Sequence, residues 1–299
     1  MKWKKLGRIF ELNKRSNKLW SHTANPTVLF LDKENIRIFY SIRDIYGKSN
    51  ISYFDYSLKD YKVRNESIDV SLEYGKIGEI DESGIGAGNI INIEDKKYLY
   101  YMAWQNENKE HWRGDIARAE LDKKLEKFKK DKKFKFSVEK DIDQVSLSYP
   151  FLLKVENKYY MWYGSTITWN YGNGEMLHVI NVAESEDGEN FSKRKSAIKY
   201  QIGSYQAFSR PCVVYYKKKW RMWFSYRGNQ DLYKIGYAES IDLEKWIIKE
   251  SGISTSEIGW DSEMICYPYV FEYDEKLYML YNGNGYGKTG IGLAVLEEE

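Results

Sequence analysis

Cysteine, histidine and proline are scarce in this chain of 299 residues, which contains two, three and four of them respectively. The two cysteines, Cys212 and Cys266, lie in strand-like runs, where free thiols are usually buried, so no disulfide framework is expected. The three histidines, His22, His111 and His178, lack the spacing of metal ligands. The composition therefore predicts neither a disulfide-stabilised fold nor a metal site.

Long apolar segments and an excess of charge are also absent. No run approaches the roughly 18 apolar residues that a membrane-spanning helix needs. The N-terminus is basic but shows no apolar core and no small-residue cleavage site, so we expect no signal peptide and a cytoplasmic location. With 46 basic and 44 acidic side chains the formal net charge is +2, which provides no basic face for nucleic acid.

Aromatic residues are abundant instead, with 27 tyrosines, 12 phenylalanines and 10 tryptophans. Such side chains favour β-strands and also line ligand clefts. One aromatic phrase recurs as NIRIFYS (35–41), KYLYYMA (97–103), KYYMWYG (158–164), KWRMWFS (219–225) and KLYMLYN (276–282). The sixth positions of these phrases are 62, 61, 61 and 57 residues apart, a regular spacing that indicates internal repeats.

Each phrase lies between two other strand-like runs, with turn-forming residues in between and no helical period. The run before it is often led by proline. Because one such antiparallel sheet cannot bury both of its faces, the repeats predict an all-β fold, a five-bladed β-propeller with three to four strands per blade. The expected single domain spans 1–299, with blades at approximately 21–67, 81–137, 145–195, 206–250 and 262–299 plus 4–12.

Two segments fall outside the repeated pattern. The last repeat ends after its third strand, and the run KKLGRIFEL (4–12) is left over at the N-terminus. We expect this run to supply the missing outer strand of the fifth blade, the alternative being a disordered tail. The lysine-rich segment 122–136 is expected to be a solvated outer strand or hairpin of the second blade.

In a propeller, the residues just before the first strand of each blade meet at one end of the central channel. Asp261 and Glu263 hold such a position in the fifth blade. In one interpretation Asp261 caps a turn and Glu263 pairs with Arg210 or Arg227. In the other, the carboxylates are acid or base groups, and Glu263 with Asp44 of the adjacent first blade forms a pair like those that cleave glycosidic bonds.

Further residues at the same rim are candidates for contacting a ligand. Trp169 lies in a loop of the third blade and is suited to stacking on a sugar ring. The alternatives are ordinary salt pairing for each arginine, a structural role for His22 and loop packing for Trp169. The candidate ligand-binding residues are His22, Asn25, Arg43, Ser148, Trp169, Arg210, Tyr226, Arg227, Asn282 and Lys288.

Several segments resemble the five-bladed furanosidase-like propellers, which include glycoside hydrolase families 32, 43, 68 and 130. The matching motifs are SHTANP (21–26), FYSIRD (39–44), SRP (209–211), WFSYRG (223–228), GWDSEMICYPYV (259–270) and YNGNGYGKTG (281–290). The resemblance covers nearly the whole chain and is closest to an uncharacterised bacterial branch often encoded beside surface-polysaccharide genes. It implies a five-bladed fold and a function in carbohydrate chemistry.

The first blade departs from the pattern of family 43, in which an aspartate beside a proline acts as the general base. Asn25 stands at this position, and an asparagine takes up no proton near pH 7. Asp44 is the substitute that we consider. Family 130 implies another route, with phosphate as the nucleophile. The basic residues available to hold a phosphate or a nucleotide-sugar diphosphate are Arg43, Arg210, Arg227 and Lys288.

The resemblance therefore implies two functions. The first is a carbohydrate-active enzyme of bacterial surface-polysaccharide metabolism that cleaves or transfers a glycosyl unit, with Glu263 as the acid and Asp44 as the assisting carboxylate. The second, favoured by Asn25, is a non-catalytic propeller that binds a sugar or nucleotide sugar during polysaccharide assembly. A protein-interaction scaffold is a third alternative. We expect a carbohydrate, sugar-phosphate or nucleotide-sugar ligand and no cofactor, and the sequence leaves an ion in the central channel open.

Overall fold

The computed structural model describes residues 1–13, 16–106, 111–194, 196–229 and 231–298. Strands dominate this part of the chain, and the one helix found in it is the single turn α1 (Asn284–Gly287). The predicted all-β class is therefore confirmed. Within the same residues, no helix has the length and apolar character needed to cross a membrane.

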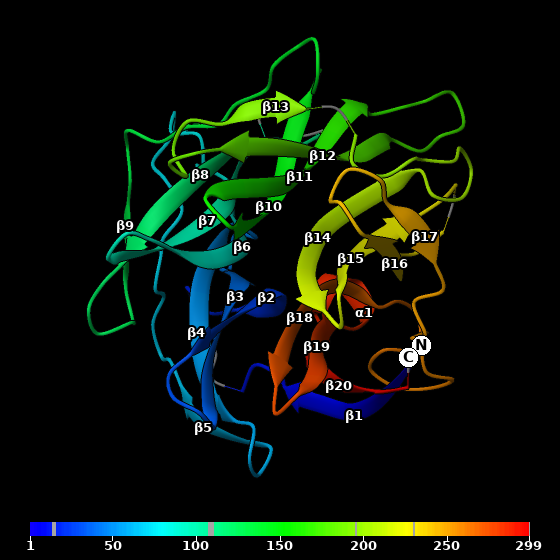
Figure 1. Ribbon diagram of the computed structural model, residues 1–299. Coiled ribbons are helices and arrows are strands. Elements are labelled where there is room, and N and C mark those ends of the chain that lie inside the picture. The colour runs from blue at the N-terminus through cyan, green and yellow to red at the C-terminus, as the bar shows by residue number, and fades with distance from the viewer. Residues whose placement is uncertain (14–15, 107–110, 195, 230, 299) are drawn as a thin grey trace.

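The described strands pair into five antiparallel units of four strands each (Figure 1). The first unit contains β2 (Ser21–Phe30), β3 (Asn35–Arg43), β4 (Ser49–Ser57) and β5 (Lys62–Glu66). The second contains β6 (Gly84–Ile93), β7 (Lys96–Gln105), β8 (Arg113–Leu121) and β9 (Phe128–Lys130). The third contains β10 (Ser146–Val155), β11 (Lys158–Thr168), β12 (Leu177–Ser185) and β13 (Ser192–Arg194). The fourth contains β14 (Ala207–Tyr216), β15 (Lys219–Arg227), β16 (Lys234–Ser240) and β17 (Ile247–Lys249). The fifth contains β18 (Cys266–Tyr273), β19 (Lys276–Asn282), β20 (Ile291–Glu298) and β1 (Lys2–Phe10).

The N-terminal strand β1 completes the fifth unit by pairing antiparallel with β20, from Trp3 opposite Leu296 to Phe10 opposite Ile291. In Figure 1 the blue β1 runs beside the red β20, and the two ends of the chain lie together. The predicted closing strand is thus confirmed. Its two most buried side chains reach both neighbouring units, because Trp3 packs edge-on against Trp223 and the ring of Phe10 stacks on that of Phe54 with centroids 3.9 Å apart.

The first strands of the units, β2, β6, β10, β14 and β18, pack against one another around the centre of the molecule. Four of them contain a bulge at an X-Pro pair, and these pairs use every proline of the chain. The residue before proline has a left-handed backbone conformation in each, with φ of +53° at Asn25, +34° at Tyr149, +50° at Arg210 and +54° at Tyr267. Such conformations are costly for residues other than glycine, and they cluster at functional sites.

The second unit has Gly88 at the position of these four residues, also within a bulge. A Cβ atom at Gly88 would lie only 2.4 Å from the carbonyl oxygens of Pro150 and Tyr100, so no side chain fits there. At Gly86, two residues earlier, a Cβ would lie 2.6 Å from the ring of Tyr149. Both glycines therefore leave space at the centre, and the ring of Tyr149 fills part of it.

A buried aspartate before the first strand is held in the same way in three of the units. It accepts a hydrogen bond from a tyrosine 20 residues later on the second strand, and it pairs with a lysine on the outer strand. These Asp–Tyr–Lys clamps are Asp81–Tyr101–Lys130, Asp143–Tyr163–Lys193 and Asp261–Tyr281–Lys5. Each clamp joins three parts of one sheet that are distant in sequence.

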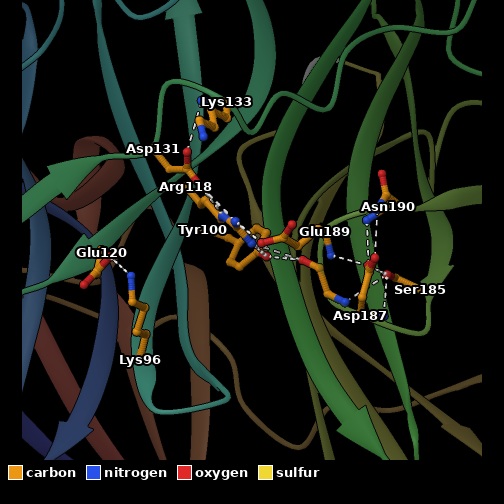
Figure 2. Close-up of polar contacts among 11 residues, drawn as sticks. Lys96, Tyr100, Arg118, Glu120, Asp131, Lys133, Ser185, Asp187, Glu189 and Asn190 are labelled. Atoms are coloured by element: carbon orange, nitrogen blue, oxygen red, sulfur yellow. Dashed lines mark hydrogen bonds and ion pairs between the residues drawn. The ribbon is translucent and has the colours of Figure 1, made fainter.

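A second polar network ties the second unit to the third (Figure 2). Arg118 on β8 donates to Asp131 over 2.9 Å and to Glu189 of the third unit over 2.5 Å. Tyr100 donates to the main-chain oxygen of Gly188 in the same unit. The buried guanidinium of Arg118 thus has two carboxylate partners, as a buried charge requires.

Candidate ligand-binding cavity

A cavity of about 290 Å³ opens where the five inner strands begin. This is close to the lower end of the usual range for small-molecule sites, roughly 300–1,000 Å³. Its aromatic lining residues are Trp104, Trp112, Tyr149, Tyr233, Tyr267 and Tyr286. Its polar lining residues are His22, Asn25, Ser41, Arg43, Ser49, Ser148, His178, Ser209 and Arg227.

Four tyrosines form a continuous wall of this cavity. The ring centroids of Tyr149 and Tyr267 are 5.5 Å apart, those of Tyr267 and Tyr286 are 6.4 Å apart, and those of Tyr286 and Tyr233 are 6.0 Å apart. Burial raises the pKa of Tyr149, Tyr233 and Tyr267. These phenols therefore stay protonated at neutral pH and are able to donate hydrogen bonds to a ligand.

Asn25 is held rigidly at the cavity by its neighbour in the fifth unit. Its main-chain N–H donates to Oδ1 of Asn282 over 3.0 Å, and Nδ2 of Asn282 donates to the main-chain oxygen of Thr23 over 2.7 Å. The Asn25 side chain is almost fully buried, yet its Oδ1 has no hydrogen-bond partner within the described chain. An unpaired buried acceptor is costly, so this atom is a ready acceptor for a ligand hydroxyl.

His178 is buried behind Ser148 and bridges two hydroxyl groups. Its Nε2 lies 2.8 Å from the Ser148 hydroxyl and its Nδ1 lies 2.7 Å from that of Thr166. Burial, and then the charge of Arg227, lower the pKa of His178 to about 3. Because the imidazolium form is so unfavourable, this serine–histidine pair does not meet the requirements of an activated nucleophile. The histidine instead fixes the orientation of the Ser148 hydroxyl.

His22, at the start of β2, also lines the cavity. Burial lowers its pKa to about 4, and the positive charges of Arg43 and Lys288 add to this effect. His22 is therefore neutral near pH 7 and offers one donor and one acceptor. Arg43 lines the cavity together with His22, and Gly287, the residue before Lys288, accepts a hydrogen bond from the Thr23 hydroxyl.

Arg227 on β15 is held by a carboxylate that the sequence did not single out. Its Nε lies 2.9 Å from Oε2 of Glu175, and its Nη2 donates to Oε1 over 3.0 Å. Glu175 is buried in the loop before β12 and is fixed by the N–H of Met176, which donates to Oε1 over 2.8 Å. This two-point contact positions the guanidinium and neutralises most of its charge.

The three predicted catalytic carboxylates are not among the residues that line the cavity. Asp44 caps the β3–β4 turn, because its Oδ1 accepts the N–H groups of Tyr46 and Lys48, each over 2.9 Å. Asp261 belongs to a clamp, with Lys5 at 2.7 Å, whereas the structural interpretation from the sequence had it capping a turn. Glu263 is exposed, and within the described residues its side chain pairs with neither Arg210 nor Arg227, the partners that one interpretation of the sequence gave it.

The predicted ligand-binding residues divide into two groups. Those that the structure brings to the cavity are His22, Asn25, Arg43, Ser148 and Arg227. The others lie outside its lining. Trp169 stacks on His111 with centroids 4.7 Å apart, and Tyr226 stacks on Tyr205 at 4.2 Å. Arg210 is buried behind the lining, Asn282 braces Asn25, and Lys288 is exposed after α1.

Sequence reasoning missed the tyrosine wall, although the sequence carries a signal for part of it. Tyr149 and Tyr267 precede a proline as Asn25 does, and aligning the five inner strands would have placed all three at the axis. Tyr233 and Tyr286 lie in variable connections outside the repeated phrase, and no repeated pattern marks them. The signal for the clamps was the constant spacing of 20 residues between aspartate and tyrosine.

The five units and the cavity at their centre define a β-propeller fold. Among solved structures, the chain is similar to a glycoside hydrolase, with a TM-score of 0.77 and 12% identity, over 99% of this chain and 93% of that one. It is also similar to the α-L-arabinofuranosidase PaAbf62A from Podospora anserina, with a TM-score of 0.70 and 12% identity, over 99% and 97%. A third similar structure is that of a thermostable family-43 glycoside hydrolase, with a TM-score of 0.67 and 17% identity, over 96% of this chain and 94% of that one. At these identities the likeness shows the fold alone.

The chain belongs to the same family as two uncharacterized proteins of Mycobacterium tuberculosis, MT1551 and Rv1502. Each is 36% identical over 304 residues, which cover 99% of this chain and 100% of the relative. No protein-family model matches the chain.

Proposed function

We propose that this propeller binds a carbohydrate in its axial cavity and does so without the two-carboxylate chemistry of glycosidases. The observation that carries the proposal is the lining itself. Aromatic faces and hydrogen-bonding groups surround the cavity, and no aspartate or glutamate is among its lining residues in the described chain. Glycoside cleavage needs two carboxyl groups that flank the scissile bond.

The lining suits a polyhydroxylated ring in two ways. Tyrosine and tryptophan faces pack against the apolar faces of a sugar. The unpaired Oδ1 of Asn25 and the fixed hydroxyl of Ser148 supply polar contacts for ligand hydroxyls. A sugar, a sugar phosphate or a nucleotide sugar is within this proposal. The cellular setting that we propose, bacterial surface-polysaccharide assembly in the cytoplasm, rests on the sequence resemblance.

A carbohydrate-active enzyme is the second candidate, and the glycoside hydrolase-like fold favours it. In this case Glu263 is the acid, with Asp44 or Asp261 as the assisting carboxylate. Asp44 and Asp261 already have structural partners, so their catalytic use requires those contacts to change. This requirement is why we rank the enzyme second.

The two candidates are separated by measuring binding and turnover on the same protein. Calorimetric titration with a panel of monosaccharides should show binding, while aryl glycosides, with and without phosphate, should not be cleaved. Asn25→Ala should weaken binding about tenfold or more, since it removes a buried acceptor. Tyr171→Ala, at an exposed loop position outside the lining, is the matched control and should bind like the wild type.

Outcomes of two kinds would contradict the proposal. One is that no saccharide binds, or that Asn25→Ala binds unchanged. The other is that the wild type cleaves a glycoside and Glu263→Gln binds it but no longer cleaves it, which would establish the enzyme instead.

A further inference from the structure

The charged side chains at the cavity are mostly positive. Arg43 and Arg227 are the charged side chains that line it within the described residues. Lys288 adds a third positive charge near the cavity, because the preceding residue, Gly287, accepts a hydrogen bond from the hydroxyl of Thr23, the residue after His22. Glu175 is the carboxylate that contacts this group, through Arg227. An excess of one sign in a recessed site attracts ligands of the other sign.

Arg210 adds a buried positive charge directly behind the lining. It is 3% exposed, and it donates to the main-chain oxygens of Pro26, over 2.6 Å, and Ala87. Its Nε has no hydrogen-bond partner, and no carboxylate pairs with it in the described part of the chain. The buried Arg118, by contrast, has two carboxylate partners. A buried cation without a counter-ion is unfavourable, and an anion in the adjacent cavity offsets that cost.

The two arginines of the lining differ in how far their charges are compensated. Glu175 compensates Arg227 with two contacts. Arg43 forms no ion pair within the described chain, so no carboxylate there compensates its guanidinium. An anion therefore gains more from contact with Arg43 than from contact with Arg227.

We propose that the cavity selects saccharides bearing an anionic group, and that Arg43 binds this group next to His22, with Lys288 adding positive charge nearby. The inference rests on the proposed carbohydrate binding. The group is a carboxylate, as in a uronic acid, or a phosphate ester. The planar guanidinium of Arg43 suits either one through paired N–H groups.

The test compares saccharides that differ only in charge, titrated into the full chain by calorimetry. Each set contains a neutral sugar, its uronic acid and its phosphate ester, and inorganic phosphate is titrated alone. We expect one anionic member to bind at least about tenfold more tightly than its neutral parent, which identifies carboxylate or phosphate as the recognised group. Arg43→Gln should remove most of this preference, because it should lower the affinity for the anionic member by a much larger factor than the affinity for the neutral parent.

Two further variants make the result specific. Glu175→Gln releases the charge of Arg227 and should raise the affinity for the anionic member relative to that for the neutral one. Arg64→Gln removes the same charge from an exposed pair on β5 and should change neither affinity. Raising the salt concentration should weaken binding of the anionic member only, because Arg43 and Lys288 are exposed to solvent.

The failures are distinguishable. If neutral and anionic members bind equally, or Arg43→Gln weakens both by the same factor, anion selection is overturned while carbohydrate binding stands. If inorganic phosphate alone binds as tightly as the phosphate ester, the site is one for free phosphate and the inference is overturned. If no saccharide of either kind binds, the proposed function itself fails.

Discussion

Four single residues that precede a proline set much of the chemistry at the centre of this propeller. Asn25, Tyr149 and Tyr267 present an amide and two phenols to the cavity, while Arg210 crosses behind it to two other units. Their shared left-handed backbone re-aims each side chain away from the regular alternation of a strand. Because the bulge is a feature of the backbone, the side chain at this position can differ between units without changing the fold.

Because of the two histidines that line the cavity, we expect the protein to lose stability in mild acid. Their pKa values in the folded protein, about 4 for His22 and about 3 for His178, lie below the ordinary value of 6.5. Below pH 6.5 the unfolded chain therefore binds more protons than the folded one, and the free energy of unfolding falls as the pH falls. Each histidine contributes a slope of about 1.4 kcal/mol per pH unit once its unfolded form is protonated.

Denaturant unfolding at pH 7, 6 and 5 measures this slope. His178→Gln should be less stable at pH 7 but show a shallower decline, whereas Thr166→Val, which removes a partner and keeps the histidine, should retain the full slope. An identical slope in His178→Gln and the wild type would refute the assignment of a buried neutral histidine.

At the scale of the element, a clamp holds together strands that are hydrogen-bonded only to their neighbours. In the fifth unit it links the approach to β18, the middle strand β19 and the closing strand β1 through Asp261, Tyr281 and Lys5. Burial acts to raise the pKa of Asp261, but the hydrogen bonds from Lys5, Ser256 and Tyr281 outweigh it and keep the pKa below its ordinary value. Burial, with the nearby Asp261 charge, raises the pKa of Tyr281.

The clamp predicts very different effects for two adjacent lysines of β1. Lys5→Met leaves the buried carboxylate of Asp261 without its ion pair and should cost about 3 kcal/mol of unfolding free energy. Lys4→Met is the matched control, since its pair with Glu297 is exposed and should contribute less than about 0.5 kcal/mol. Equal midpoints for the two variants in urea unfolding would mean that the clamp has no special role.

The sequence allowed the strands to be predicted but not the partners of its carboxylates. The recurring aromatic phrase identifies each middle strand because alternation and turn residues act over a few neighbouring positions. The partner of Asp261, however, is Lys5, which is 256 residues away. In the sequence alone, a structural aspartate and a catalytic aspartate just before a strand cannot be distinguished. The same limit explains why Glu175, which lies outside the repeated pattern, was overlooked.

At the scale of the whole molecule, the ring is closed by hydrogen bonds between β1 and β20. Trp3 and Phe10 extend this closure into the units on either side. Loss of each buried aromatic side chain costs about 3–5 kcal/mol, and the pair together rivals the total stability of a typical domain, about 5–15 kcal/mol. The closing strand is thus as important as any core strand.

Removal of residues 1–10 should therefore abolish cooperative thermal unfolding and leave β20 as an exposed, aggregation-prone edge. A synthetic peptide of residues 1–12, added in excess, should restore a cooperative transition. The same peptide with Trp3→Ser and Phe10→Ser should not. A shortened chain that melts at the wild-type temperature would show that the closure is dispensable.

The β1–β20 pairing also dictates an order of events during synthesis. β1 leaves the ribosome before the four strands of the first unit, but its only pairing partner among the described strands is β20, made after all the other strands. Contacts between such distant segments form slowly. Until β20 has been made, the nascent chain must carry β1 as an unpaired strand that exposes Trp3 and Phe10, and the ring can close only after that point.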